Sequence, residues 1–555
     1  MGLDAFPVRQ LVDEAVDGSI DVPEFQRAFV WRPDQVRALA DSLFRGYPIG
    51  QILTWDNPEY AQSRVALDGR GHKLWLVDGQ QRATALCLLF GRKPYWWPDP
   101  DDWNKRLTST SVLANVGSVE GTVEFGLANP VRSADPRWVL VRDLVGGDGR
   151  SGGNGGAPSL AARAAQLHEK LPPPLREKLP VAEVESRLTA IWELRNRVIP
   201  VASVQHAIED VAEIFARLNQ QGTEVREADV SLAVAAALRP GWVREEFVPF
   251  TKNLSESGYD LEPGIVIRVL TSIGEGKPRL GDVSRGFWKD PLFDHVWSLA
   301  KESLSAVTGE MMAAGLLSSA SVPSRNALIP LAVLRAKYVK DGFQFKKAFH
   351  WFLMANRAGR YSTASTSALT EDVKLIRNSE GFPQALEALR GGLDVDLKVT
   401  ASEFLEPWSW NRPLLLLLYL TLLDHGAVDW ATRQPIGKSN NVPEFGFVPH
   451  WHYFFPPSAS VLRATKFDFS DDEVRALANI VLLSHKPKGR PWSTSPPSKY
   501  VREAKVTARE LEQQYIPLDS ALWEPERYRD FLADRSKSLA RAVNRYLAGL
   551  FGAPS

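Results

Sequence analysis

Five consecutive residues, Asp78, Gly79, Gln80, Gln81 and Arg82, combine groups that bind phosphate. They follow the apolar segment KLWLV, which the pattern predicts to be a strand, and precede ATALCLLF, which is predicted to be a helix. Backbone N–H groups and the helix dipole favour an anion at such a helix start. Arg82 could grip a phosphate, the glutamine amides could bond phosphate or sugar oxygens, and Asp78 could hold Mg²⁺ or orient a water. The segment therefore indicates a phosphate site.

A second interpretation of this segment is structural, because Asp-Gly is also a strong signal for a hairpin turn. A helix rather than a second strand follows, which weakens that alternative. Upstream, Gln26 and Arg27 are polar residues within an apolar stretch, and the pattern leaves open whether they face solvent or the site. A helix is expected to begin at Pro33 and to end at Gly46.

These motifs together resemble a known family. FQRAFVW, a helix that ends in GYPIG, and VDGQQRATAL are similar to the N-terminal domain of GmrSD-type modification-dependent restriction proteins, which carries a DGQQR motif on a ParB/sulfiredoxin-like fold. IFARLNQQG at 214–222 and GRYSTASTSALTEDV at 359–373 resemble later blocks of the family, so the resemblance covers roughly 1–380. It implies binding and hydrolysis of GTP or another nucleoside triphosphate, coupled to nuclease action on phage DNA with modified bases or on phosphorothioate DNA.

The resemblance also assigns residues. It implies that nucleotide binding involves Gln26, Arg27, the run Asp78 to Arg82, Arg217 and Asn219, with Asp78 and Arg82 as catalytic groups. For Arg217 and Asn219 the alternative is local capping at a helix end. Phe29, Val30 and Trp31 could line a pocket that inspects the modification, although the apolar pattern favours a place in the core.

The region from 440 onward resembles the His-Asn-His (HNH, ββα-metal) nuclease domain that usually follows this N-terminal domain. HWHYFFPPS at 450–458 is the anchor, and the resemblance implies His452 and Asn479 as catalytic residues and His450, His452 and His485 as metal ligands. Such a nuclease needs a divalent metal, Mg²⁺ or Mn²⁺, and a neutral histidine that deprotonates water. The alternative is that these are ordinary structural polar residues.

One position departs from this pattern. Counting back from Pro456, Tyr453 occupies the usual place of the general base, and a tyrosine with a pKa near 10 is a poor base at neutral pH. Either the loop is shifted by one residue, so that His452 is the base and His450 a ligand, or the nuclease is weakened or lost.

The charge pattern favours DNA as a partner. Lys and Arg total 66, as do Asp and Glu, so the chain is neutral overall. The segment 484–509, however, contains seven basic residues and only one acidic residue. We expect phosphate contacts from Lys486, Lys488, Arg490, Lys499, Arg502 and Lys505 in this segment.

Composition and length indicate a folded protein of several domains. The chain has 555 residues, of which 44% are apolar and 24% charged. A single cysteine, Cys87, excludes multi-thiolate zinc sites and favours a cytoplasmic location. The longest apolar run, Leu414 to Leu423, is too short to span a bilayer, so we expect a buried helix and no membrane.

The expected organisation is α/β followed by mainly α structure. We expect a nucleotide-binding domain at 1–145, a glycine-rich linker at 146–158, a helical region at 159–400 and the HNH-like nuclease at 401–555. The function so predicted is an anti-phage enzyme: a nucleotide-hydrolysing sensor of modified DNA joined to a metal-dependent nickase or endonuclease, with a homodimer as one assembly state. The alternatives are a nucleotide-gated DNA-binding regulator with an inactive nuclease, and an N-terminal domain that binds DNA without hydrolysing nucleotide.

Overall fold

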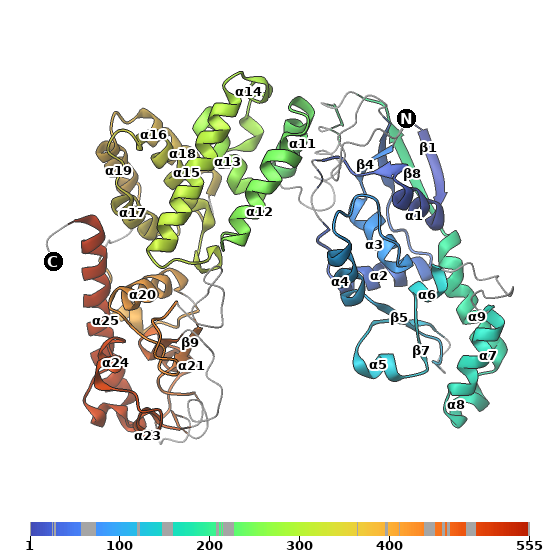
Figure 1. The fold of residues 1–555 in the computed structure, drawn as a ribbon. Helices are drawn as coiled ribbons and strands as arrows, with labels where there is room; N and C mark the ends of the chain where they lie inside the picture. The colour runs from blue at the N-terminus through green and yellow to red at the C-terminus, as the bar shows by residue number, and fades with distance from the viewer. Residues whose placement is uncertain are drawn as a thin grey trace. The chain divides into compact units, whose positions relative to one another are not determined.

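The chain folds into two compact units, Met1–Glu246 and Phe247–Ser555, in the computed structural model (Figure 1). The structure describes residues 2–24, 26, 29–56, 74–118, 122–146, 159–206, 210–211, 214, 227–362, 365–393, 398–409, 411–437, 450–457, 461–462, 467–483 and 495–552. The division between the units falls between Glu246 and Phe247, and the expected domain boundaries at 146–158 and near 400 stay predictions. Most of the glycine-rich segment, 147–158, lies outside the described residues.

The first unit alternates strands and helices. Its elements are β1 (Gly2–Pro7), α1 (Val8–Asp17), β2 (Ile20–Asp21), α2 (Pro33–Phe44), β3 (Ile52–Asp56), β4 (Leu74–Asp78), α3 (Gln80–Phe90), α4 (Pro100–Ser109), β5 (Val112–Asn115), β6 (Glu124–Leu127), α5 (Pro130–Ala134), β7 (Trp138–Leu140), α6 (Arg142–Val145), α7 (Leu160–Lys170), α8 (Pro173–Lys178), α9 (Val181–Trp192), the 3₁₀ turn η1 (Glu193–Asn196), β8 (Val198–Val204), α11 (Glu227–Leu238) and the π-helical turn η2 (Val243–Phe247).

A five-stranded mixed sheet forms the centre of this unit, in the order β1-β8-β3-β4-β2. β8 pairs antiparallel with β1 and parallel with β3, β3 pairs antiparallel with β4, and β4 pairs parallel with β2. A strand from residue 198 onward therefore lies between two strands from the first 60 residues. The sheet places the end of β4, at Asp78, beside Leu53 of β3.

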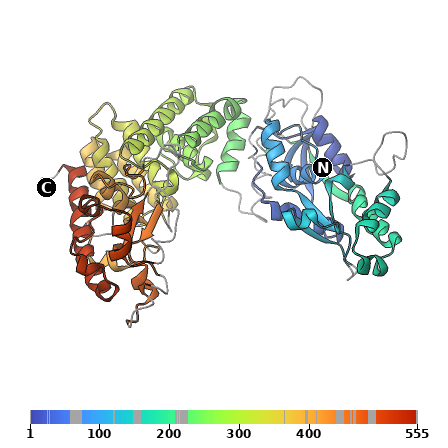
Figure 2. The ribbon, with the colours of Figure 1, turned by 60° about the horizontal axis from the view of Figure 1, so that its bottom comes forward.

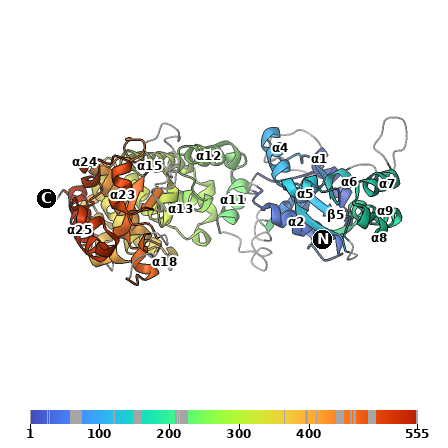
Figure 3. The same ribbon diagram turned by 90° about the horizontal axis from the view of Figure 1, so that it is seen from below.

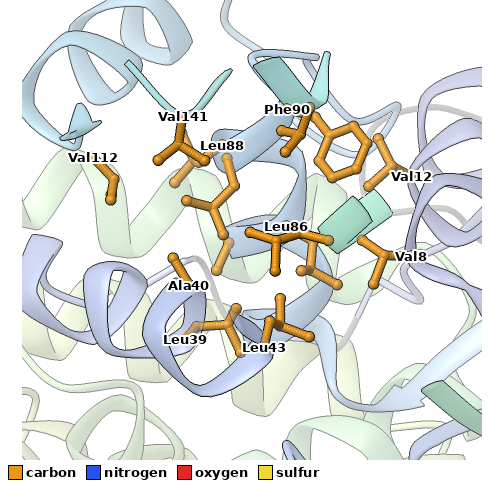
Figure 4. Close-up of a cluster of buried hydrophobic side chains, with 14 of the residues drawn as sticks. Val8, Val12, Leu39, Ala40, Leu43, Leu86, Leu88, Phe90, Val112 and Val141 are labelled. Carbon is orange, nitrogen blue, oxygen red and sulfur yellow. The ribbon is translucent and has the colours of Figure 1, made fainter. Parts of the chain in front are cut away.

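The main core lies between the sheet and three helices. Apolar residues from α1, α2 and α3 pack together in one buried cluster (Figure 4). The cluster also contains sheet residues such as Ile52 and Leu76. Nearly every residue of α3 is buried, whereas α1 and α2 bury one face each. A smaller cluster around Trp55 and Trp75 involves alternate residues of the same strands, as the alternation of side chains along a strand requires. The start of α3 is thus held on a rigid scaffold.

Smaller elements complete the first unit. β5 lies between β6 and β7 in an antiparallel three-stranded sheet. Helices α7 and α9 pack against each other and lie side by side in Figures 1 and 3. The short strand β7 covers only Trp138–Leu140, and α6 begins two residues later at Arg142.

The second unit is mainly helical. Its elements are α12 (Val248–Glu256), α13 (Pro263–Gly274), η3 (Leu280–Asp282), α14 (Arg285–Lys289), α15 (Phe293–Ala313), η4 (Ser319–Ser321), η5 (Arg325–Ala327), α16 (Leu328–Tyr338), α17 (Phe345–Arg357), α18 (Ser365–Asn378), α19 (Phe382–Gly391), η6 (Ser402–Leu405), α20 (Arg412–Asp424), β9 (His450–Tyr453), α21 (Asp471–Val474), η8 (Leu477–Asn479), β10 (Ile480–Leu483), α23 (Pro497–Glu503), α24 (Ala508–Glu512), η9 (Ser520–Trp523), η10 (Pro525–Arg527) and α25 (Tyr528–Phe551).

The long terminal helix α25 organises the end of this unit. It packs against α17 and α20, and Figure 2 shows it in red beside the orange and yellow helices of the same unit. Arg535 of α25 is fully buried and donates to the carbonyl oxygens of Ala478 and Gln514, at 2.7 and 3.0 Å. The run Leu414 to Leu423 lies within α20, whose residues Leu414 to Leu422 are buried, as the sequence predicted. Within the described part of the chain, no helix is both long enough and apolar enough to cross a membrane.

Candidate functional sites

The residues Asp78 to Arg82 form the junction between β4 and α3. β4 ends at Asp78, and Gly79 turns the chain with a φ of +96°, a left-handed conformation that glycine adopts without strain. Gln80 begins α3, and no side chain caps this helix start. The structure thus confirms the expected strand, turn and helix and excludes the hairpin alternative. Backbone N–H groups at this helix start are directed out of the helix end, as an anion site requires.

The guanidinium of Arg82 is fixed in place by two acceptors. It donates to Oδ2 of Asp78 at 2.8 Å and to the carbonyl oxygen of Ile49 at 2.9 Å. Gly50 allows this approach, because a Cβ added there would lie 2.4 Å from Nη1, whereas a Cβ added to Gly79 would instead meet Cδ1 of Ile52 at 2.3 Å. Asp78 and Arg82 are partly exposed, at 35% and 17%. A charged pair that water still reaches can exchange one partner for a ligand.

Two glutamines of the site, Gln26 and Gln81, form hydrogen bonds with backbone groups of neighbouring segments. Gln26 is buried and donates from Nε2 to the carbonyl oxygen of Val77 at 2.8 Å, so it ties the preceding loop to the end of β4. Oε1 of Gln81 accepts the N–H of Val30 at 2.8 Å. Gln80 is buried at the helix start. Gln26 and Gln81 are therefore positioned to shape the site.

Of the residues expected to sense a modification, two pack against the core. Phe29 and Trp31 are partly buried and pack against the main core cluster. Arg106 of α4 lies over the ring of Phe29, with its Cζ 5.1 Å from the centroid, and donates to the carbonyl oxygen of Trp31 at 2.5 Å. Val30 alone of the three is more than half exposed, at 53%. The structure therefore favours the core interpretation for Phe29 and Trp31 and leaves Val30 at the surface.

The structure adds a buried carboxylate that sequence reasoning missed. Glu24 accepts the backbone N–H groups of Gly241 and Arg244 at 2.9 and 3.2 Å, and burial raises its pKa. It joins the loop before Gln26 to the segment after α11. No motif marks Glu24, because its partners are backbone groups more than 200 residues away. Arg27, Arg217 and Asn219 lie outside the described residues.

The family comparison applies to this same part of the chain. Residues 8–129 match the family described as the GmrSD restriction endonuclease, N-terminal domain. Residues 8–129 are a GmrSD-type N-terminal domain. The chain is also similar to an uncharacterized protein of Methanocaldococcus jannaschii, with 34% identity over 88 residues, which is 14% of this chain and 15% of that relative. The chain thus matches a small part of the relative's length.

The GmrSD-type domain includes the whole strand-turn-helix site. Its matched residues contain β3, β4 and α3, with Gln26 and the run Asp78 to Arg82. They stop before β8, the strand that pairs with both β1 and β3. The match lies entirely within the first unit, so the prediction of a nuclease in the second unit rests on its residues alone.

In the second unit, the candidate nuclease residues lie on a two-stranded antiparallel ladder. β9 pairs with β10, and His452 is opposite Val481. Along β9, His450 and His452 share one face, while Trp451 and Tyr453 share the other. His450 is exposed, whereas the Nε2 atom of His452 is buried. The hydroxyl of Tyr453 accepts the indole N–H of Trp408 at 3.0 Å.

Asn479 is fully buried, and both Oδ1 and Nδ2 of its amide form hydrogen bonds. Its Oδ1 accepts the N–H of Phe455 at 2.8 Å, and its Nδ2 donates to the carbonyl oxygens of Phe455 and Val474 at 3.0 and 2.9 Å. These bonds fix the turn that follows β9 to the residues before β10. Asn479 therefore acts as a positioning residue for this backbone, and its expected catalytic role stays a prediction.

The described donors do not complete a metal site. Among the residues that the structure describes, no group of three or more His, Cys, Asp or Glu side chains could hold a metal ion. His450 and His452 supply two imidazoles on one strand face, but the Nε2 of His452 is buried in this conformation. His485 lies outside the described residues. The described residues therefore do not form a complete metal centre.

The described part of the basic segment presents an exposed cationic surface. Lys499 and Arg502 of α23 and the nearby Lys505 are exposed, and Lys499 faces Glu503 at 4.0 Å. Lys486, Lys488 and Arg490 lie outside the described residues. Exposed Lys and Arg side chains around one short helix can contact successive phosphates.

The block at 359–373 has a structural basis in a buried charge network. Arg360 donates to both oxygens of Asp372, at 2.7 and 2.6 Å, and the Tyr361 hydroxyl bonds the same carboxylate. Hydrogen bonding to Asp372 raises the pKa of Arg360, and burial raises that of Tyr361. Asp372 is fully buried, so these partners stabilise α18 against the turn that precedes it. The resemblance pointed to this segment without assigning these residues.

Proposed function

We propose that this protein is an anti-phage restriction enzyme that binds and hydrolyses a nucleoside triphosphate in its first unit and cleaves or nicks DNA with its second. The observation that carries the proposal is the fixed Asp78–Arg82 pair at an uncapped helix start, within a GmrSD-type domain. Modified DNA, with modified bases or phosphorothioate linkages, is the proposed signal, and turnover at Asp78 to Arg82 reports it.

The geometry suggests how the first unit handles phosphate. In this structure Arg82 bridges Asp78 and the carbonyl of Ile49. An incoming phosphate competes for the same guanidinium and adds hydrogen bonds from the N-terminal amides of α3. When Arg82 turns to the phosphate, the carboxylate of Asp78 is released to orient the attacking water. A divalent ion that accompanies the nucleotide would neutralise charge on the phosphates.

The test is a hydrolysis panel with a matched pair of variants. Phosphate release is measured for each of the four triphosphates, with and without modified DNA, in the full-length protein. Arg82→Ala should abolish hydrolysis. Arg45→Ala is the control, because Arg45 forms the same i,i+4 ion pair with Asp41 on the surface of α2. Full hydrolysis by folded Arg82→Ala contradicts the proposal, and so does hydrolysis of none of the four by the unaltered protein.

A second function is favoured by a specific observation. Tyr453, at the expected base position, is engaged by Trp408, and the Nε2 of His452 is buried. Both fit a nucleotide-gated DNA-binding regulator whose nuclease is inactive. Supercoiled plasmid incubated with Mg²⁺, Mn²⁺ or Ni²⁺ separates the two functions: nicking that is lost in His452→Ala supports the enzyme, and absence of nicking with every metal supports the regulator.

A further inference from the structure

A pocket of about 280 Å³ lies next to β9 in the second unit. Its walls come from five parts of the chain: η4, the segment after η6, α20, β9 and β10. The apolar lining includes Trp408, Trp451, Tyr419 and Leu482. Nothing in the proposed nuclease or nucleotide chemistry uses this pocket, because the candidate histidines lie on the other face of β9.

Two tryptophans form the aromatic wall of the pocket. The rings of Trp408 and Trp451 lie 4.9 Å apart at 54°. The Tyr453 hydroxyl holds the indole N–H of Trp408, and the backbone N–H of Trp408 donates to the carbonyl oxygen of Arg475 at 3.1 Å. Trp451 is fixed by its place in the β9–β10 ladder, opposite Leu482. The aromatic surface is therefore pre-organised and partly exposed.

Two polar groups at the pocket, Arg412 and the hydroxyl of Ser321, have no bonding partner within the described ranges. Arg412, at the start of α20, is exposed and forms no hydrogen bond or ion pair with any residue in the described ranges. The hydroxyl of Ser321 is buried and, within the same ranges, has no hydrogen-bond partner. Since no bond holds that hydroxyl, rotation about χ1 can turn it towards a ligand. The site thus combines a planar apolar wall, a hydroxyl and a free cation.

We propose that this pocket binds one nucleobase against Trp451 and Trp408, with the attached phosphate at Arg412. Indole rings stack on any base, and a volume near the lower end of the range for ligand sites suits a single base. The free cation argues against a purely apolar occupant, such as a side chain of a protein partner. The base comes either from a free mononucleotide or from an unstacked position in a DNA strand. The site is separate from the one at Asp78 to Arg82, so it does not depend on the function proposed above.

The hydrogen bond between Trp408 and Tyr453 gives Tyr453 a role in the pocket that differs from the general-base role of the nuclease pattern. Its hydroxyl fixes the orientation of Trp408, so Tyr453 is a positioning residue for the pocket. Tyr453→Phe removes this single bond and keeps the ring. Binding of the base should weaken in Tyr453→Phe because Trp408 loses its orientation, and Tyr453→His should not restore it.

The experiment uses 2-aminopurine, whose fluorescence falls when it stacks. Full-length protein is titrated into 2-aminopurine nucleoside 5′-monophosphate in one arm and a short single-stranded DNA with one central 2-aminopurine in the other. We expect saturable quenching that weakens about 5- to 150-fold in Trp451→Ala, the range for removal of one stacking partner. Arg412→Ala should weaken it as well, whereas Arg285→Ala, which removes an exposed arginine of α14, should not.

The outcomes separate the sources and can overturn the proposal. Quenching of the monophosphate that is lost in Trp451→Ala identifies a free nucleotide as the ligand, and quenching of the DNA arm alone identifies a base in a strand. The absence of quenching in both arms overturns the proposal, as does quenching unchanged in both Trp451→Ala and Arg412→Ala. An apolar protein segment would then be the better candidate. Arg412 is exposed, so Arg412→Ala keeps the test valid even if Trp451→Ala does not fold.

Discussion

The placement of Arg82 can be disturbed without changing the motif itself. Gly50 has a φ of +84°, and a Cβ at this position would lie 2.4 Å from Nη1 of Arg82. Because the guanidinium is the end of a flexible side chain, we expect Gly50→Ala to push it away from the carbonyl of Ile49. Gly46, in the same loop, is the matched control: its φ is +72°, and the nearest atom to an added Cβ is 3.8 Å away.

The expected magnitudes follow from these two sites. A left-handed alanine costs about 1–2 kcal/mol in both variants. Gly50→Ala also loses the bond from Arg82 to Ile49, about 1 kcal/mol more, which corresponds to a melting temperature roughly 2–4 °C below that of Gly46→Ala. A displacement of about 1 Å in a catalytic group costs on the order of 100-fold in rate. We therefore expect nucleotide hydrolysis to fall about 10- to 100-fold in Gly50→Ala and less than about twofold in Gly46→Ala.

The assay is steady-state phosphate release together with thermal unfolding, for both variants and the unaltered protein. Gly50→Ala that is folded and hydrolyses nucleotide at the full rate would show that the position of Arg82 is irrelevant to turnover. An equal loss of activity in both variants would refute the reasoning in another way, because it would assign the effect to the loop's conformation and not to the contact with Arg82.

Three further predictions concern the second unit. Asn479→Ala leaves buried backbone groups without partners and should therefore lower the free energy of unfolding by about 3 kcal/mol. Denaturant titration measures this change, and a decrease below about 1 kcal/mol contradicts the positioning role of Asn479. Burial, with a contribution from Arg390, lowers the pKa of His350 to about 4, below its unfolded value near 6.5. Stability should therefore be lost as pH falls from about 6.5 towards 4, by on the order of 2–3 kcal/mol, and His350→Gln should flatten this part of the curve. Replacement of Lys499, Arg502 and Lys505 by glutamine should reduce the salt slope of DNA binding by up to about 3, and an unchanged slope excludes this surface from the interface.

The strand-turn-helix at Asp78 to Arg82 could be predicted because local chemistry determines it. A buried strand, an Asp-Gly turn and an apolar helix face are all visible in consecutive residues. The pairing of Arg82 with Ile49 could not be predicted, because it depends on a left-handed turn at Gly50 in a loop more than 30 residues earlier. The expected helix start is thus confirmed and its ion pair comes only from the structure, while the phosphate that it would bind stays a prediction.

Long-range pairing accounts for other differences. β8 lies within the region 159–400 that was expected to be helical, and nothing local shows that it pairs with β1 and β3. Asn479 looks like a motif residue in the sequence, yet its burial depends on backbone groups of Phe455 and Val474. The bond between Tyr453 and Trp408 likewise joins residues 45 positions apart, so the sequence could not show that the Tyr453 hydroxyl has this partner.

The position of β8 has a consequence for how the protein is made. A nascent chain that has reached residue 129 contains every residue of the family match but not the strand that joins β1 to β3. Until Val198–Val204 has been synthesised, the exposed edges of β1 and β3 have no partner and can pair with other chains. The sheet therefore closes late during translation, and fragments cut at the end of the matched region should aggregate where those extended to Glu246 should not.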